Sequence, residues 1–147
     1  MTRIGASSDG PFELRPVGRV ESSLRDPDLA PLQGDEGSPD AWLIFDQAVG
    51  EGVRDLEPGA DILVLTWLHR ARRDVLRLHP RDDRAQAERG VFSTRSQDRP
   101  NPIGLHPVRI VFIDGPTRVR VRDLEAVDGT PILDVKPVLR PRETGRP

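Results

Sequence analysis

The chain has 147 residues and a net charge of -2 at pH 7, which is the size of one domain with its own core. It contains no cysteine, and this excludes disulfide bridges, thiolate metal sites and cysteine nucleophiles. No run of about 18 apolar residues and no charged-then-apolar leader is seen, so we expect a cytoplasmic protein that neither crosses a membrane nor is secreted.

The first predicted strand covers residues 12–20, where apolar and polar side chains alternate. Residues 24–40, rich in Asp, Gly and Pro, are expected to form a long loop of the kind that is usually functional or mobile. Along the whole chain, 28 proline and glycine residues recur at intervals that are typical of short strands joined by turns. The sequence therefore predicts a mainly β domain.

Residues 42–45 are strongly apolar, and the next expected element is a short helix that Asp46 caps and Pro58-Gly59 ends. Residues 62–68 then form a nearly continuous apolar run that is too short for a typical helix pattern. Such a run predicts a central strand that is buried on both faces.

Further strands are predicted over residues 74–79, 90–94, 108–113, 117–122 and 132–136. In the fourth of these, Val119 and Val121 alternate with Arg118, Arg120 and Arg122, so one strand face carries three guanidinium groups. A solvated sheet face is the simplest interpretation of this pattern. A platform for RNA is the alternative, although the chain has no Tyr and few other aromatic residues to stack on bases.

The charges are unevenly distributed along the chain. Residues 1–68 carry 5 Arg against 13 Asp and Glu, whereas residues 69–122 carry 13 Arg against 6 acidic residues. This pattern indicates that an anionic partner meets the middle of the chain, or that the two parts face each other in the fold or across a dimer.

Residues 90–105 form the most informative segment. Two prolines fix their own φ angles and disfavour helical conformations at the preceding Arg99 and Asn101. Arg95 and Arg99 would then present planar guanidinium groups to a carboxylate or phosphate, while Asn101 offers a donor and an acceptor. The segment is either an anion-binding loop or an ordinary proline-rich connection.

Residues 123–137 form the second candidate segment. Asp128 and Gly129 are a turn signal between two β-like runs, and a plain hairpin turn is the simplest interpretation. Lys136 is the only lysine beside 21 arginines, which indicates a position that needs a compact point charge. The three histidines show no metal-binding spacing, so no metal is expected.

Three motifs resemble the signature of the TsaA-like (TrmO) family in their residues, order and spacing, and the similarity covers most of residues 15–139. In that family Gln33 would correspond to a Gln in an N-terminal Pro-Arg-Gln element. The motifs are Gly90-Val91-Phe92-Ser93-Thr94-Arg95, Arg99-Pro100-Asn101-Pro102-Ile103-Gly104, and Asp128-Gly129-Thr130-Pro131 followed by Asp134-Val135-Lys136-Pro137.

The resemblance implies a compact antiparallel β-barrel with short helices and long loops over residues 11–139, between a flexible tail at residues 1–10 and a frayed tail at residues 140–147. It implies an S-adenosylmethionine-dependent methyltransferase that acts on N6 of threonylcarbamoyladenosine next to the tRNA anticodon, and a homodimer. The residues implied to bind the cofactor are Gln33, Gly34, His69, Arg95, Leu105, Leu124, Asp128, Gly129 and Thr130.

The four catalytic candidates are Arg95, Asn101, Asp134 and Lys136. By hypothesis Arg95 binds the carboxylate of the cofactor or of the threonyl group, and Asp128 binds a polar group of the cofactor. The N6 proton must leave, so Asp134 or His69 would act as general base while Lys136 stabilises charge on the carbamoyl oxygen.

The chain departs from the family pattern at two positions that bear on substrate identity. Leu32 stands where the family usually has Arg, and Val138 stands where it usually has Tyr. Two alternatives to the tRNA reaction therefore stay open: a module that binds S-adenosylmethionine without transferring the methyl group, and a methyltransferase with a different small or RNA substrate.

Overall fold

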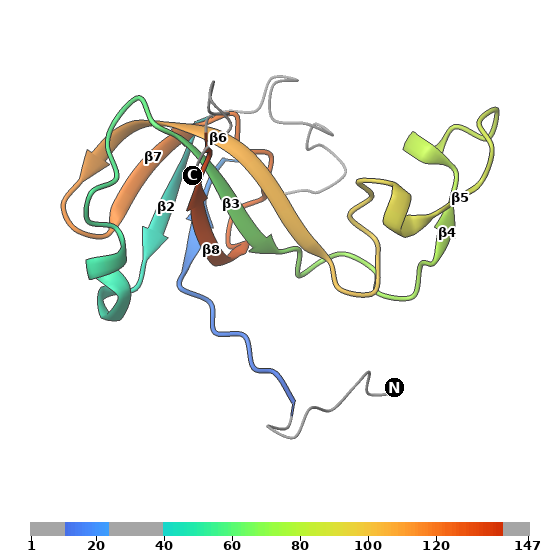
Figure 1. The fold of residues 1–147 in the computed structure, drawn as a ribbon, viewed down its shortest axis with the longest axis horizontal. Helices are drawn as coiled ribbons and strands as arrows, with labels where there is room; N and C mark the ends of the chain where they lie inside the picture. The colour runs from blue at the N-terminus through green and yellow to red at the C-terminus, as the bar shows by residue number, and fades with distance from the viewer. Residues whose placement is uncertain (1–10, 24–39, 140–147) are drawn as a thin grey trace, which may run out of the picture.

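The computed structural model of the chain describes residues 11–23 and 40–139. Six strands form a closed antiparallel barrel in the order β1-β2-β7-β6-β3-β8, which confirms the predicted mainly β fold (Figure 1). The strands are β1 (Gly18–Glu21), β2 (Ala41–Phe45), β3 (Asp61–Trp67), β6 (Ile103–Asp114), β7 (Arg118–Arg122) and β8 (Pro131–Pro137).

The barrel encloses the hydrophobic core. Along each strand, side chains that point inward alternate with side chains that point outward, as the period of two in a β-strand requires. The inward side chains are apolar, and those of Val20, Leu43, Val64, Val119 and Ile132 are completely buried.

β3 differs from its prediction, because only one of its faces is fully buried. Ile62, Val64 and Thr66 lie inside the barrel, whereas Leu63 and Leu65 point outward and are half-buried. A barrel wall has one inner face, and no helix of the described residues covers the outside of β3. The apolar run therefore reflects a second, partly open apolar surface on the barrel.

The predicted short helix is confirmed as the 3-10 helix η3 (Gln47–Gly52), which follows Asp46. Asp46 makes no side-chain capping hydrogen bond, so it begins the helix without the predicted contact. Val53 is buried in the core and Leu56 packs against it, which fixes this connection to the barrel.

Residues 69–101, which we call the lobe, leave the barrel between β3 and β6 (Figure 1). At its base the N–H of Leu68 donates a 2.8 Å hydrogen bond to the carbonyl of Pro102. Val91 is its only buried side chain, and every residue of the lobe is described. Its elements are β4 (Arg77–Leu78), which pairs with β5 (Arg89–Gly90), and the 3-10 helices η4 (Pro80–Asp82) and η5 (Val91–Ser93).

Three predicted strands are wrong in extent. Of residues 12–20 only the end belongs to β1, of residues 74–79 only two belong to β4, and residues 91–93 are helical. These segments have no long neighbouring strand to pair with, so their alternation does not suffice to form a ladder. Conversely, β6 begins at Ile103 rather than at residue 108, because it pairs with β3 along the whole length of that strand.

Residues 123–130, which we call the closing segment, connect β7 to β8. Leu124, Ala126 and Val127 are buried, so the segment contributes to the core instead of passing over the surface. The turn at Asp128 and Gly129 exists, with Gly129 at a φ of +84°. The hairpin interpretation is wrong, however, because β7 and β8 are not neighbours in the barrel.

Candidate cofactor and substrate site

Several predicted site residues gather at the end of the barrel from which the lobe projects. β3 ends there at Trp67 and is followed by His69, which is exposed. Leu65 lies opposite Leu105 of β6 on one side and opposite Asp134 of β8 on the other. Because these residues point out of the barrel, Leu105 and Asp134 border one outer surface.

Lys136 lies on the same outer surface. It is opposite Leu63, and its Nζ is 3.3 Å from a carboxylate oxygen of Asp134. Both charged side chains are about half exposed. The surface is otherwise apolar, with Ile103 and Leu105 more than 40% exposed. An apolar patch therefore adjoins a carboxylate–ammonium pair, which is an arrangement that suits a ligand with both a flat ring and polar groups.

Asn101 is held at the base of the lobe by Arg73. The guanidinium of Arg73 lies 5.1 Å from the centre of the Trp67 ring and donates hydrogen bonds to the Pro100 carbonyl (2.7 Å) and to Asn101 Oδ1 (2.9 Å). These contacts fix Asn101 beside the end of β3. The amide nitrogen of Asn101 remains available as a donor among the described residues.

The two arginines of the predicted anion-binding loop have different roles. Arg99 donates hydrogen bonds to the backbone carbonyls of Val91, Thr94 and Ser96, so it braces the lobe and the prediction that it binds an anion is wrong. Arg95 is exposed and makes no hydrogen bond or ion pair within the described part of the chain. Of the two, Arg95 alone is free to bind a carboxylate.

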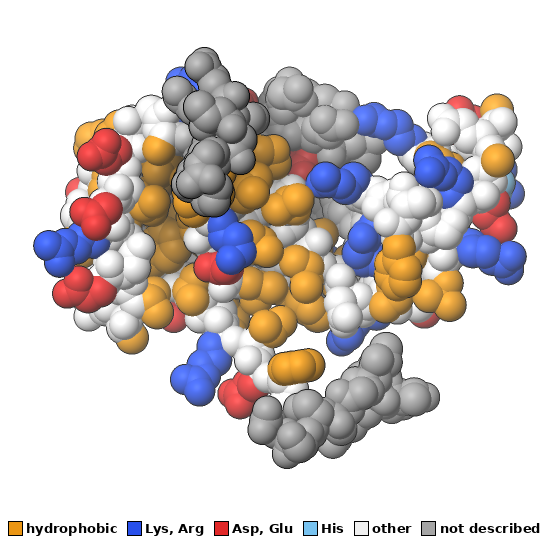
Figure 2. All heavy atoms as spheres, in the orientation of Figure 1, with side chains coloured by type: hydrophobic (Ala, Val, Ile, Leu, Met, Phe, Trp, Pro, Cys, Tyr) orange, Lys and Arg blue, Asp and Glu red, His pale blue; other side chains and the backbone are white. Residues whose placement is uncertain are grey.

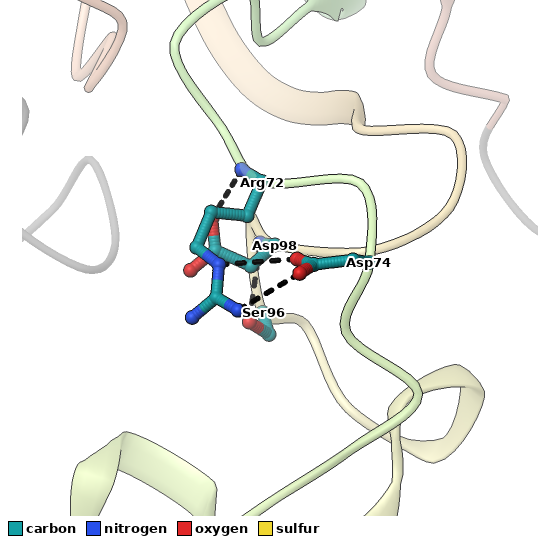
Figure 3. A network of polar contacts seen from close by, with 4 residues as sticks. All are labelled: Arg72, Asp74, Ser96 and Asp98. Atoms are coloured by element: carbon teal, nitrogen blue, oxygen red, sulfur yellow. Dashed lines mark hydrogen bonds and ion pairs between the residues drawn. The ribbon is translucent and has the colours of Figure 1, made fainter.

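A polar network fastens the two ends of the lobe to each other (Figure 3). The backbone N–H of Arg72 donates to Asp98 Oδ1 at 2.8 Å, and its guanidinium makes two 3.1 Å hydrogen bonds to Asp74. The N–H of Asp98 also donates to Ser96 Oγ. Hydrogen bonds from Arg72 lower the pKa of the Asp74 carboxyl, and the same contact raises the pKa of Arg72.

The closing segment positions the remaining predicted residues. Asp128 Oδ1 accepts a 2.9 Å hydrogen bond from the N–H of Ser22, and the N–H of Gly129 donates to the carbonyl of Val20. The side chain of Leu124 is completely buried, and the Thr130 hydroxyl donates to the Val127 carbonyl inside the fold. Leu124 and Thr130 therefore have only backbone atoms to offer a ligand. Gln33 and Gly34 lie outside the described residues.

The sequence analysis missed a buried polar group beneath this end of the barrel. His106 is 4% exposed, and its Nε2 is 2.7 Å from the Thr66 hydroxyl. Its Nδ1 is 3.4 Å from a carboxylate oxygen of Glu125 in the closing segment. His106 alternates with the inward Gly104 and Val108, so extending the period-two pattern back from residue 108 could have placed it inside the barrel.

A surface cleft of about 440 Å³ lies away from these residues and includes Arg109 and Arg122 in its lining. Val138, one of the two positions that bear on substrate identity, lines it, whereas none of the predicted catalytic or cofactor-binding residues does. Among the described ranges, no group of three His, Asp or Glu side chains is placed to hold a metal ion. No helix in those ranges has the length and apolar character needed to cross a membrane.

Two proteins that are similar in sequence cover most of this chain. A probable S-adenosyl-L-methionine-binding protein of Methanothermobacter thermautotrophicus is 42% identical over 130 residues, which cover 88% of this chain and 92% of that protein. An S-adenosyl-L-methionine-binding protein of Archaeoglobus fulgidus is 39% identical over 123 residues, covering 84% of this chain and 86% of its own.

Two solved structures are also similar. A crystal structure of TrmO from Pseudomonas aeruginosa matches with a TM-score of 0.63 at 25% identity, and another TrmO crystal structure matches with a TM-score of 0.64 at 27% identity. Each match covers 88% of this chain, which spans about half the length of the solved TrmO chains, 56% of each.

The sequence profile of the tRNA-methyltransferase O N-terminal domain matches residues 19–142, which include the lobe and the barrel except for Gly18. This match confirms the resemblance that the three motifs indicated. The chain belongs to the family of the tRNA-methyltransferase O N-terminal domain.

Proposed function

We propose that the protein is an S-adenosylmethionine-dependent methyltransferase that acts on N6 of threonylcarbamoyladenosine in tRNA, as a cytoplasmic homodimer. The observation that carries the proposal is that Leu105, Asp134 and Lys136 border one outer surface along β3, while Asn101 is held by Arg73 beside the end of that strand. Family membership and the names of the relatives support the cofactor.

The residues at this end of the barrel fit the cofactor chemically. S-adenosylmethionine supplies a methyl group on a positively charged sulfur, and it carries an adenine ring, an amino group and a carboxylate. The exposed Ile103 and Leu105 offer an apolar surface for the ring, and Arg95 offers an unpaired guanidinium for the carboxylate. A β-carbon at Gly129 would meet nothing within 4 Å, so a ligand can approach the backbone there.

The chain's own residues would orient the substrate and move one proton. Asn101, held by Arg73, donates a hydrogen bond to the substrate base, and Lys136 stabilises negative charge on the carbamoyl oxygen. Asp134 or His69, both exposed, accepts the N6 proton. Orientation matters most in such a displacement, because holding the two reactants in the right geometry can lower the activation barrier by about 7–11 kcal/mol.

The test is to incubate the full chain with methyl-labelled S-adenosylmethionine and tRNA that carries threonylcarbamoyladenosine, and to identify the N6-methylated nucleoside by mass spectrometry. The Lys136→Ala variant should lose about a hundredfold in kcat, because one stabilising donor is removed from the transition state. Arg19→Ala is the matched control, since it removes an exposed cation from β1 on the same barrel, and it should leave kcat unchanged.

Two outcomes would contradict parts of this proposal. Unchanged kcat in the Lys136→Ala variant would exclude the assigned role of that lysine. Calorimetric binding of S-adenosylmethionine without a methylated product from any tRNA would instead favour a binding module or another substrate, with Leu32 and Val138 the first positions to examine. The names of the two archaeal relatives refer to binding, which makes this second function the specific alternative.

A further inference from the structure

The outer face of β2, β7 and β6 brings together side chains that are far apart in the sequence. Across these three strands, Arg120 of β7 lies directly opposite Trp42 of β2 and opposite Phe112 of β6. The neighbouring row places Arg118 opposite Ile44 and Asp114. We call this surface, with Arg122 and Arg109 in the row beyond, the arginine–aromatic face.

The two aromatic rings of this face, Trp42 and Phe112, contact each other. The centroids of Trp42 and Phe112 are 6.2 Å apart, with an angle of 88° between the ring planes. The guanidinium of Arg118 lies 4.8 Å from the centre of the Trp42 ring. Phe112 is nevertheless 53% exposed, so a planar group can still stack on it.

Among the described residues, the four arginines of this face are paired with acids except for Arg122. Arg118 lies 3.7 Å from Asp114, Arg120 lies 3.2 Å from Asp40, and Arg109 lies 2.9 Å from Asp61. Arg122 makes no hydrogen bond or ion pair among the described residues.

Arg122 also lies opposite another arginine, Arg109, and both border the 440 Å³ cleft. Two carboxylates share this cleft with the arginines, because Asp61 is hydrogen-bonded to Arg109 at 2.9 Å and Asp123 also lines the cleft. Arg122 is hydrogen-bonded to neither of them, so its guanidinium can bind a phosphate.

We infer that the arginine–aromatic face binds an unpaired stretch of RNA, as a second contact with the tRNA outside the methyl-transfer site. The inference rests on the proposed tRNA substrate. RNA combines the two chemistries of the face, because its bases stack on aromatic rings and its phosphates bind arginines. Phe112 stacks a base, while Arg120 and Arg122 bind the backbone on either side.

This face is distinct from the candidate methyl-transfer surface. Leu105 and Lys136 lie on the outer side of β6 and β8 beside β3, whereas Trp42 and Arg120 lie on β2 and β7. The two surfaces meet only along β6, where Leu105 belongs to the part paired with β3 and Phe112 to the part paired with β7. A tRNA that binds both must therefore extend around the barrel.

The test measures binding of fluorescein-labelled oligouridine and of an unmodified tRNA transcript to the full chain by fluorescence anisotropy, at several salt concentrations. Phe112→Ala should weaken binding about five- to a hundredfold, the usual loss for one base–aromatic stack. Phe112→Trp should retain it. Arg122→Gln should reduce the slope of log affinity against log salt concentration by about 1, the value expected for the loss of one phosphate contact.

Two matched variants control for general effects. Phe12→Ala removes a phenylalanine outside the face that is even more exposed than Phe112, and Arg54→Gln removes an exposed arginine next to η3. Neither should change RNA affinity. Thermal melting of every variant verifies that the barrel is intact, and Phe112→Trp separates loss of stacking from loss of folding.

The outcomes distinguish this inference from the proposed function. Equal affinity of wild type and Phe112→Ala for both RNAs overturns the inference, even if the tRNA is methylated. Dependence on Phe112 without any methylated product supports the RNA face while the proposed reaction fails. A change in sedimentation of Phe112→Ala, with unchanged RNA affinity, would show that a second copy of the chain occupies the face and would overturn the inference as well.

Discussion

Gly104 of β6 has no side chain where its backbone faces the contact between Thr66 and His106. A β-carbon built there would lie 2.3 Å from Thr66 Oγ1 and 2.5 Å from His106 Nε2, far inside van der Waals contact. Those two atoms form the hydrogen bond that joins Thr66 to His106, and all three residues are buried. The size of residue 104 therefore decides whether the polar group beneath the candidate site can form.

Gly104→Ala should destabilise the fold by about 1–3 kcal/mol, because the added methyl group forces buried neighbours apart. Urea unfolding followed by circular dichroism measures this change. Gly52→Ala is the control, since a β-carbon at Gly52 meets nothing within 4 Å, and it should leave the free energy of unfolding within about 0.5 kcal/mol of wild type. Equal stability of the two variants would contradict the packing argument.

The amino-acid sequence predicted which chemical groups stand at single positions, but it did not predict which partners those groups contact. Arg95 and Arg99 are indistinguishable by type, yet the structure leaves Arg95 exposed and uses Arg99 to bind three backbone carbonyls. The sequence could not separate them, because carbonyls become partners only when the loop has closed around one guanidinium.

At the scale of elements, the lobe and the barrel are stabilised differently. The barrel has a continuous core, whereas the lobe buries one side chain, Val91, and depends on polar contacts between its two ends. Figure 2 shows basic side chains spread over the lobe at the right, while apolar side chains gather over the barrel. We therefore expect the lobe to open locally before the barrel unfolds.

Protonation of Asp74 should loosen the lobe. Arg72 lowers the pKa of Asp74 below its ordinary value of 3.8, so the contact stabilises the lobe above that value and is lost as the pH falls through the lowered pKa. Hydrogen exchange of the lobe measures this, with wild type and Asp74→Asn compared at each pH. Asp74→Asn should exchange faster near neutral pH, and the difference should disappear as the pH falls through the lowered pKa of Asp74. A constant difference over the whole range would contradict this role of Asp74.

The positions of the strands in the sequence were predicted in part. Strands 117–122 and 132–136 are confirmed within a few residues because each has barrel neighbours on both sides. Residues 90–94 read as a strand but contain η5, since the lobe offers only the two-residue β4 for pairing. The pairing of a strand depends on its neighbours, which alternation along one segment does not specify.

At the scale of the whole molecule, the candidate site joins a rigid barrel to a weakly packed lobe. Leu105 and Lys136 are fixed by strand pairing, whereas Arg95 lies in the lobe. A ligand that contacts both parts would hold them together, because binding to the native state alone shifts the folding equilibrium toward it.

S-adenosylmethionine should accordingly raise the melting temperature of the chain. A hundredfold excess over Kd adds about 2.7 kcal/mol, or about 5–10 °C for a chain of this size. Scanning calorimetry should show a smaller shift for Arg95→Ala, whereas Arg84→Ala, which removes another exposed arginine of the lobe, should behave like wild type. An identical shift in both variants would exclude Arg95 from the cofactor site.

The sequence by itself determined the mainly β class, the family motifs and the lack of cysteine chemistry, because composition, turn residues and period-two alternation are local properties. Only the tertiary structure decided that Thr66, His106 and Glu125 meet inside the barrel, and that Trp42 and Phe112 meet outside it. These contacts join residues 19 to 70 positions apart in the chain. Closure of the barrel selects them, since the order and register of the strands depend on how all six pair at once.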